Sequence, residues 1–248
     1  MLTSTERLGR TRLRVSPGTG GGRCRVRTAT TASDPTVSVV RPVVVAHGAD
    51  TARVALVPEG ALLLAGDAVE IDVSVDAGAH LDLVEPGGTV AFDMRGARAR
   101  WDVRVDVRAG GSLTWAGLPF VIAAGADVDR TLRIRYDAGA RLALRETLVL
   151  GRFGEQPGRI HQRTEVLTGA GEPVLVEDLP LDPSSAGLLL GGHRVLTSVL
   201  LLGDTADVAD TGPDDRYDLD QPGATLWRRL GHQAHETELA AVWRQVRG

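Results

Sequence analysis

The sequence contains no lysine, a single cysteine and few aromatic residues, and each shortage removes a class of function. All 28 basic residues are arginines, so the chain has no lysine for Schiff-base chemistry or for a P-loop phosphate site. Cys24 alone cannot form an internal disulfide or a cysteine-based zinc site. The single cysteine is typical of proteins from a reducing cytoplasm.

Long apolar runs and clustered positive charge are also missing. The longest apolar runs, residues 188–190 and 199–202, are far too short to cross a bilayer, and the N-terminal residues show no signal core. The net charge of −4 does not favour nucleic-acid binding, which needs clustered positive charge. Because 43% of the 248 residues are hydrophobic, the chain can bury a core. We expect one cytoplasmic domain over residues 1–248, β-rich from 5 to 205.

A short phrase recurs about every 30 residues, each time after a run that alternates polar and apolar side chains. It reads AGAHLDL at 77–83, AGGSLTW at 109–115 and AGARLAL at 138–144. Alternation with period two indicates strands with one buried face, and glycine suits the turn between them. Equivalent places in the phrase are taken by four leucines if PEGALLL is counted as an earlier, looser copy: Leu63, Leu81, Leu113 and Leu142.

Two architectures fit this repeat. The units are either successive β-hairpins of a sandwich or the coils of a β-helix-like stack, since fixed periods of about 20–50 residues are typical of repeat folds. Both are mainly β. Strands on either side of residue 50 are expected to break at Pro42 and Pro58. Apolar residues at helical spacing predict a helical segment over about 223–246.

Three carboxylate-bearing stretches are candidates for chemistry. Asp67 follows a glycine after an apolar run, Glu177 interrupts an apolar strand, and Glu146, Arg152 and Glu155 flank one turn in ETLVLGRFGE. A buried carboxylate is costly unless it is paired or used. Each carboxylate therefore either pairs with a nearby arginine, such as Arg145, Arg152 or Arg159, or offers oxygen ligands to a divalent cation in passage.

Histidines give a weaker signal. His232 and His235 are three residues apart, a spacing that on a helix can chelate a metal ion, although an ordinary polar helix surface is the favoured explanation.

The order of four segments resembles the UreD (UreH) family of urease accessory proteins, in its actinobacterial form, over residues 5–205. The segments are LLLAGDAVEIDVSVDAGAHLDL, WAGLPFVIAAGADV, ETLVLGRFGE and PVLVEDLPLD. The resemblance implies a β-helix-like stack of strands with a few helices. It further implies a non-catalytic scaffold that binds apo-urease and a UreF-like protein, which recruits a nickel-carrying UreG-like GTPase. Nickel in transit would then be the cargo, with no tightly bound cofactor and no stable metal site.

The resemblance also suggests roles for individual residues. Asp67 matches an acid at the mouth of the family's nickel tunnel, with Glu177 as a weaker second position on the nickel path. Glu146, Arg152 and Glu155 match a block that shapes the tunnel or an interface. On this basis, Asp67→Ala should lower urease activation and leave folding intact. The alternatives are a generic all-β adaptor and a β-solenoid carbohydrate-active enzyme, although the latter usually has more aromatic residues than two tyrosines and four tryptophans.

Overall fold

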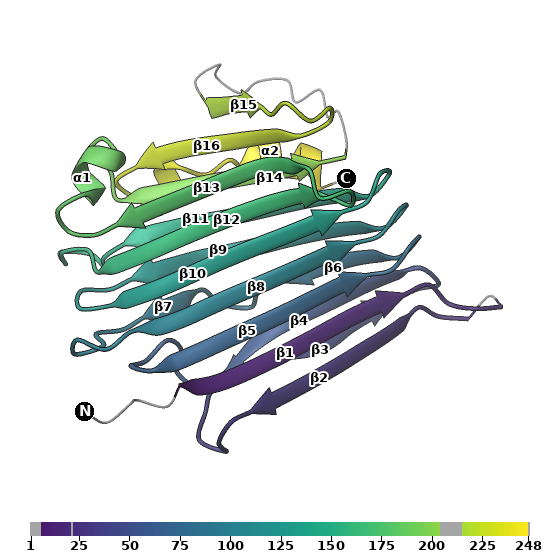
Figure 1. Ribbon diagram of the computed structural model, residues 1–248, viewed down its shortest axis with the longest axis horizontal. Helices are drawn as coiled ribbons and strands as arrows, with labels where there is room; N and C mark the ends of the chain where they lie inside the picture. The colour runs from purple at the N-terminus through teal and green to yellow at the C-terminus, as the bar shows by residue number, and fades with distance from the viewer. Residues whose placement is uncertain (1–5, 21, 204–214, 248) are drawn as a thin grey trace.

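The computed structural model describes residues 6–20, 22–203 and 215–247, and its strands form two facing sheets (Figure 1). Sheet A contains β1 (Arg7–Ser16), β2 (Arg25–Ala32), β5 (Asp67–Val75), β8 (Ala99–Val107), β10 (Asp127–Tyr136), β12 (Arg159–Thr168) and β13 (Pro173–Leu181). Sheet B contains β3 (Val39–His47), β4 (Thr51–Glu59), β6 (His80–Val84), β7 (Thr89–Ala91), β9 (Ser112–Ile122), β11 (Arg141–Leu150), β14 (Val195–Leu202), β15 (Arg216–Asp218) and β16 (Thr225–Gly231).

The chain moves from one sheet to the other along most of its length, which makes the fold a β-helix-like stack. Parallel pairing joins β1, β5, β8, β10 and β12 in sheet A, and β4, β6, β9 and β11 in sheet B. Antiparallel strands such as β2, β13, β14 and β16 complete the sheets. The predicted fold class is confirmed, and the hairpin alternative is excluded for these coils.

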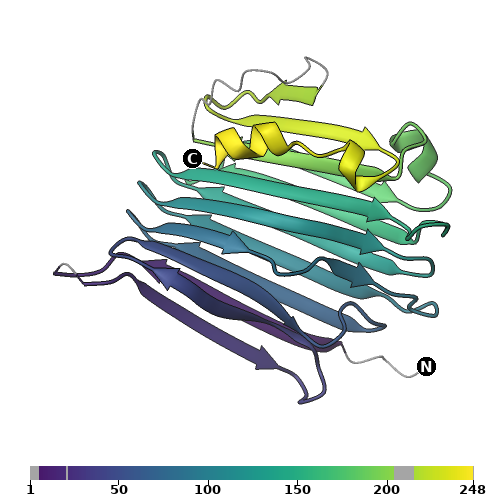
Figure 2. The same cartoon turned by 180° about the vertical axis from the view of Figure 1, so that it is seen from behind.

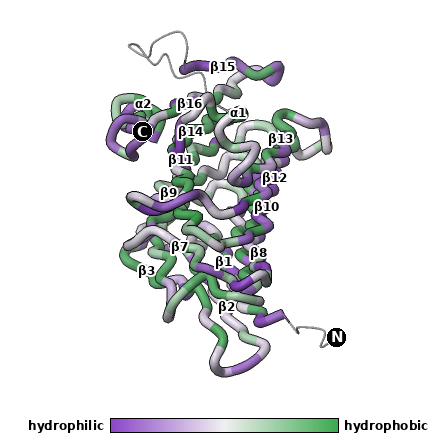
Figure 3. The backbone as a smooth tube through the Cα atoms, turned by 90° about the vertical axis from the view of Figure 1, so that its left-hand side faces the viewer, coloured by the Kyte–Doolittle hydropathy of each residue, from purple (hydrophilic) through white to green (hydrophobic). Residues whose placement is uncertain are grey.

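The described residues also form three short helices in the C-terminal third of the chain. They are α1 (Ala186–Leu189), the 3-10 helix η2 (Ala234–Glu236) and α2 (Ala240–Val246). Figure 2 shows α2 over the outer face of sheet B, and Figure 3 shows the two sheets as separate layers with α2 outside them. Val242, Trp243 and Val246 of α2 pack with Val199 and Trp227 in a second, smaller core. No helix in the described part of the chain has the length and apolarity needed to cross a membrane.

The recurring phrase forms one turn of the stack, repeated in neighbouring coils. Its glycines Gly78, Gly110 and Gly139 have φ angles of +69°, +69° and +76°, a conformation that residues with a Cβ rarely adopt. The turns bond directly to one another, for example from the Gly110 N–H to the Gly139 carbonyl at 3.1 Å. The phrase therefore recurs because each coil needs a turn with a positive φ angle at the equivalent position.

The leucines of the phrase form a continuous column between the sheets. Leu81 pairs with Leu113, and Leu113 pairs with Leu142, and each is at most 2% exposed. Leu63 does not belong to this column, contrary to the sequence analysis. Ala52 of β4 takes the place beside Leu81, while Leu63 bonds through its N–H to Val90 of β7.

Two further sequence expectations need correction. The C-terminal helical region is confirmed but is shorter than predicted: it consists of η2 and α2, because residues 225–231 form β16. Leu226 and Leu230 are four residues apart, and a spacing of four places two side chains on one face of a strand as well as of a helix. Strands β3 and β4 also run through Pro42 and Pro58 without a break. Pro42 lies on an edge strand, and Pro58 lies beyond Ala55, where β4 stops pairing with β6.

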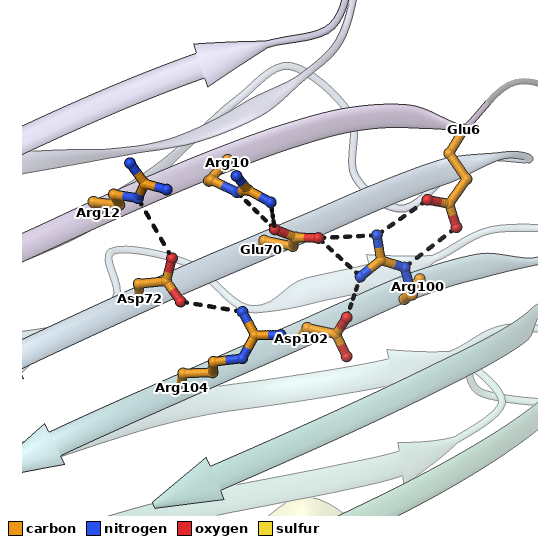
Figure 4. A network of polar contacts seen from close by, with 8 residues as sticks. All are labelled: Glu6, Arg10, Arg12, Glu70, Asp72, Arg100, Asp102 and Arg104. Atoms are coloured by element: carbon orange, nitrogen blue, oxygen red, sulfur yellow. Dashed lines mark hydrogen bonds and ion pairs between the residues drawn. The ribbon is translucent and has the colours of Figure 1, made fainter.

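The outer face of sheet A carries alternating arginines and carboxylates that pair with one another (Figure 4). Arg100 bonds to Glu6, Glu70 and Asp102, and Asp72 lies between two arginines. Most of these arginines are substantially exposed, so each pair contributes little to stability on its own. The pairing explains why strands with so many charges still form a regular sheet.

Candidate functional site

A row of polar side chains crosses the otherwise largely apolar space between the two sheets. In sheet B, Glu146 of β11 pairs in register with Ser198 of β14, which pairs with Arg228 of β16. In sheet A, Arg130 of β10 pairs with Gln162 of β12. We call the following residues the interior polar row: Glu85, Arg130, Glu146, Gln162, Glu177, Ser198 and Arg228.

The first ion pair of the row joins the two sheets. The Arg130 guanidinium binds the Glu146 carboxylate, and its Nη1 donates to Gln162 Oε1 at 2.8 Å. Its guanidinium carbon also lies 5.0 Å from the centre of the Phe120 ring. The two charged side chains are 12% and 21% exposed, so water screens this pair much less than the pairs on the outer face.

The second ion pair lies at the β13 and β16 end of the row. Arg228 donates from both terminal nitrogens to the two oxygens of Glu177, at 2.5 and 3.1 Å. Its Nε donates to Ser198 Oγ at 3.2 Å. This fork geometry is the strongest arrangement available to an arginine and a carboxylate. The side chains of Glu177, Ser198 and Arg228 therefore satisfy one another's hydrogen bonds.

Glu85 is the third carboxylate of the row, and it is bound by N–H groups of a different kind. The Trp115 indole and the Leu118 backbone each donate to it at 2.9 Å. Burial raises the pKa of Glu85, and the two hydrogen bonds oppose this shift. Glu85 was not predicted from the sequence, because it lies just before Pro86, where a strand is expected to have ended. The signal was the alternation Leu81, Leu83, Glu85, which continues the buried face of β6 by one position.

A bulge in β9 lies opposite Glu146 and beside Glu85. Arg145 pairs with Ala116 and Thr147 with Pro119, so two residues, Gly117 and Leu118, oppose Glu146 alone. The extra residue turns the Leu118 N–H towards Glu85.

Small cavities follow the row. One of about 30 Å³ is lined by Glu85, Arg130 and Glu146, and another of about 20 Å³ by Glu146, Glu177 and Arg228. Leu132, Leu144 and Glu146 line both cavities. A water molecule needs a cavity volume of at least about 10–15 Å³. Each of the two cavities therefore has room for one or two water molecules. The row is thus accompanied by two water-sized cavities, and Glu146 lines both of them.

A cleft of about 200 Å³ lies on the outer side of sheet B, beside η2 and α2. It shares four lining residues with the first cavity, and these are Gly117, Leu118, Arg145 and Thr147. Only the bulged part of the sheet therefore separates the interior polar row from this surface cleft.

Comparison with known proteins identifies the family. A family described as UreD urease accessory protein matches residues 8–244. The chain belongs to the UreD family. It is 48% identical to urease accessory protein UreD 1 of Streptomyces griseus over 206 residues, which cover 79% of this chain and 78% of the relative. It is 38% identical to a UreD protein of Streptomyces avermitilis over 61% of this chain and 62% of the relative, less than two thirds of that protein.

Of the residues assigned from the UreD resemblance, Glu146 and Glu177 lie in the interior polar row, and Arg152 and Glu155 do not. Arg152 and Glu155 pair with each other in the turn after β11, where Nε and Oε1 are 2.9 Å apart. The Arg152 side chain, together with backbone N–H groups, lowers the pKa of Glu155 to about 2. The expectation that Glu146 pairs with Arg145, Arg152 or Arg159 is wrong, because its partner is Arg130 on the facing sheet.

Asp67, the acid matched to the UreD tunnel mouth, lines neither of the two cavities. It is 2% exposed, and its Oδ2 accepts a hydrogen bond from the Leu64 N–H at 2.7 Å. Its Oδ1 lies 3.6 Å from the Arg7 Nε and accepts no hydrogen bond from the described residues. Alanine at this position would leave the Leu64 N–H without its acceptor, which is expected to cost about 1–3 kcal/mol of stability. Asparagine keeps an acceptor oxygen and is the better substitution.

We predict that Asp67→Asn changes the pH dependence of stability. Burial raises the pKa of Asp67, so the folded state binds more protons than the unfolded state between about pH 4 and the raised pKa. This group therefore lowers the stability of the wild type as the pH rises through that range. Thermal unfolding from pH 4 to 7 should show the asparagine variant gaining stability relative to the wild type. A difference that stays constant with pH would contradict this prediction.

Proposed function

We propose that the protein is a non-catalytic scaffold of urease maturation that conducts nickel to the urease active site along the interior polar row. It binds apo-urease and a UreF-like protein, and through the latter a UreG-like GTPase. Membership of the UreD family supports the urease accessory role. The observation that carries the nickel path is the row itself, a line of carboxylates and water-sized cavities enclosed between the sheets.

The charges of the row suit a cation in transit. Three carboxylates, Glu85, Glu146 and Glu177, face two guanidiniums, so the row has a net negative charge when Glu85 is ionised. Burial raises the pKa of Glu85, and a cation in the row would favour its ionised form. Carboxylate oxygens can replace part of the hydration shell of a divalent ion. The arginines compete for the same oxygens, which keeps any nickel complex weak and allows the ion to leave. Asp67 would act only before the row, since it lines neither cavity.

Co-purification tests the proposed function. The tagged chain is co-expressed with the urease subunits and with the UreF-like and UreG-like proteins of its own genome. We expect apo-urease and the UreF-like protein to be recovered together, and urease activity to depend on both the chain and added nickel. Recovery of neither partner by a soluble, folded chain would overturn the proposal and favour an adaptor for another complex.

A further inference from the structure

Two histidines far apart in the sequence lie face to face at one end of sheet B. His193 comes just before β14, and His232 follows β16 directly. The strands are joined there by the Arg194 N–H, which donates to the Gly231 carbonyl at 3.1 Å. The two ring centres are 4.8 Å apart, and the ring planes are tilted by 32°. The strand pairing therefore holds the two imidazoles together.

Both rings retain a nitrogen that can bind a metal ion. His193 Nδ1 lies 3.0 Å from the Leu190 carbonyl, so Nδ1 carries the proton and Nε2 keeps its lone pair. This arrangement, with one nitrogen donating to a carbonyl, is typical of histidine ligands. The His232 ring has no hydrogen-bond partner among the described residues, and the side chain is exposed. Solvent and ions can therefore reach the pair.

The separation of the rings matches that of two imidazoles on one ion. A metal–nitrogen bond of about 2.1 Å places each ring centre about 3.2 Å from the metal, and two ligands at about 90–110° then have centres about 4.5–5.2 Å apart. The observed 4.8 Å lies within this range.

We propose that His193 and His232 form an open, weak binding site for a divalent transition-metal ion. Imidazole prefers Cu²⁺, Ni²⁺ and Zn²⁺ over Mg²⁺ or Ca²⁺. The described residues provide no cluster of three or more histidine, cysteine or carboxylate ligands, so water or a partner protein completes the coordination. The site is open for that reason, and its occupancy depends on the free metal concentration.

This pair replaces the one suggested by sequence spacing. His232 and His235 do not share a helix, because His232 lies in the loop after β16 and His235 in the three-residue η2. The interior polar row ends on the same two strands, at Ser198 and Arg228. Those residues are four to five positions away from the histidines, or about 13–17 Å along the strands.

Metal titration of the full-length chain, purified without a histidine tag, tests the site. Ni²⁺ and Cu²⁺ binding is measured by calorimetry, and Cu²⁺ is also followed by electron paramagnetic resonance. We expect one ion per chain, nitrogen hyperfine structure from two imidazoles, and at least about tenfold weaker binding in His193→Ala and in His232→Ala. His235→Ala and His80→Ala, which remove a neighbouring and a distant histidine, should bind like the wild type. Mg²⁺ should not compete.

Two results would overturn the proposal. Weakening by His232→Ala and His235→Ala, with His193→Ala unaffected, would assign the metal to the pair close in sequence. Equal binding by all four variants would show that the two rings only stack. The inference does not rest on the proposed function, because it concerns the isolated chain. Loss of this site would leave the co-purification result unchanged, and a failed co-purification would leave the titration unchanged.

Discussion

The combined substitution Arg130→Met and Glu146→Leu is expected to leave the protein folded and to reduce nickel-dependent urease activation. Buried ion pairs are often replaced by apolar residues of similar volume without loss of stability. The same change removes the central carboxylate of the interior polar row and places an apolar side chain at the position that lines both cavities. Moving an ion past such an apolar constriction costs far more than the roughly 1.4 kcal/mol that corresponds to a tenfold change in rate. Activation should therefore fall at least about tenfold.

Single and surface variants separate the effect on the proposed nickel path from the effect on stability. Glu146→Leu alone leaves the Arg130 guanidinium, 12% exposed, without its carboxylate, and should destabilise the protein by about 3 kcal/mol. The pair Arg133 and Glu165, 3.8 Å apart on the outer face, provides the control. Replacing both with glutamine should affect neither stability nor activation. A folded Arg130→Met, Glu146→Leu variant with normal activation would remove the interior polar row from the nickel path.

The pattern of alternation predicts the strands well but leaves their partners open. Residues 99–107 and 127–136 each show one buried face, and that holds for a hairpin as much as for a coil of a stack. Parallel pairing of β8 with β10 depends on the route of the chain between them, which alternation does not encode. The turn glycines were the better guide, since Gly78, Gly110 and Gly139 recur at the spacing of one coil.

The candidate site could be predicted only in part, because sequence proximity is a poor guide to contacts between sheets. Glu146 is six residues from Arg152 but pairs with Arg130 on another strand of the facing sheet. Arg145, its neighbour in the chain, points to the opposite face and lies 5.3 Å from the Trp243 ring. Whether a charge in a strand is buried follows from alternation, but its partner follows from the register of two sheets.

The second large effect is expected from Leu113→Ala, which shortens the central side chain of the leucine column. Leu113 is 1% exposed and lies between Leu81 and Leu142 in register. Truncation removes buried apolar surface and leaves a cavity, since strands hydrogen-bonded on both sides cannot close in. Such substitutions cost about 2–5 kcal/mol, which is a large fraction of the stability of a typical domain. Denaturant unfolding should show this loss. Leu188→Ala, at an 87% exposed position, should change stability by less than about 0.5 kcal/mol.

The same column makes a sharper test of whether the repeat is a cooperative unit. Leu81 pairs with Leu113 on one side and with Ala52 on the other. The column of large side chains therefore ends at Leu81. Truncating Leu81 and Leu113 together enlarges one shared cavity, and the combined loss should differ from the sum of the two single losses by at least about 0.5 kcal/mol. Strict additivity would mean that neighbouring coils do not stabilise each other through the column. The recurring phrase would then serve its glycine turn alone, and its leucines would be interchangeable core residues.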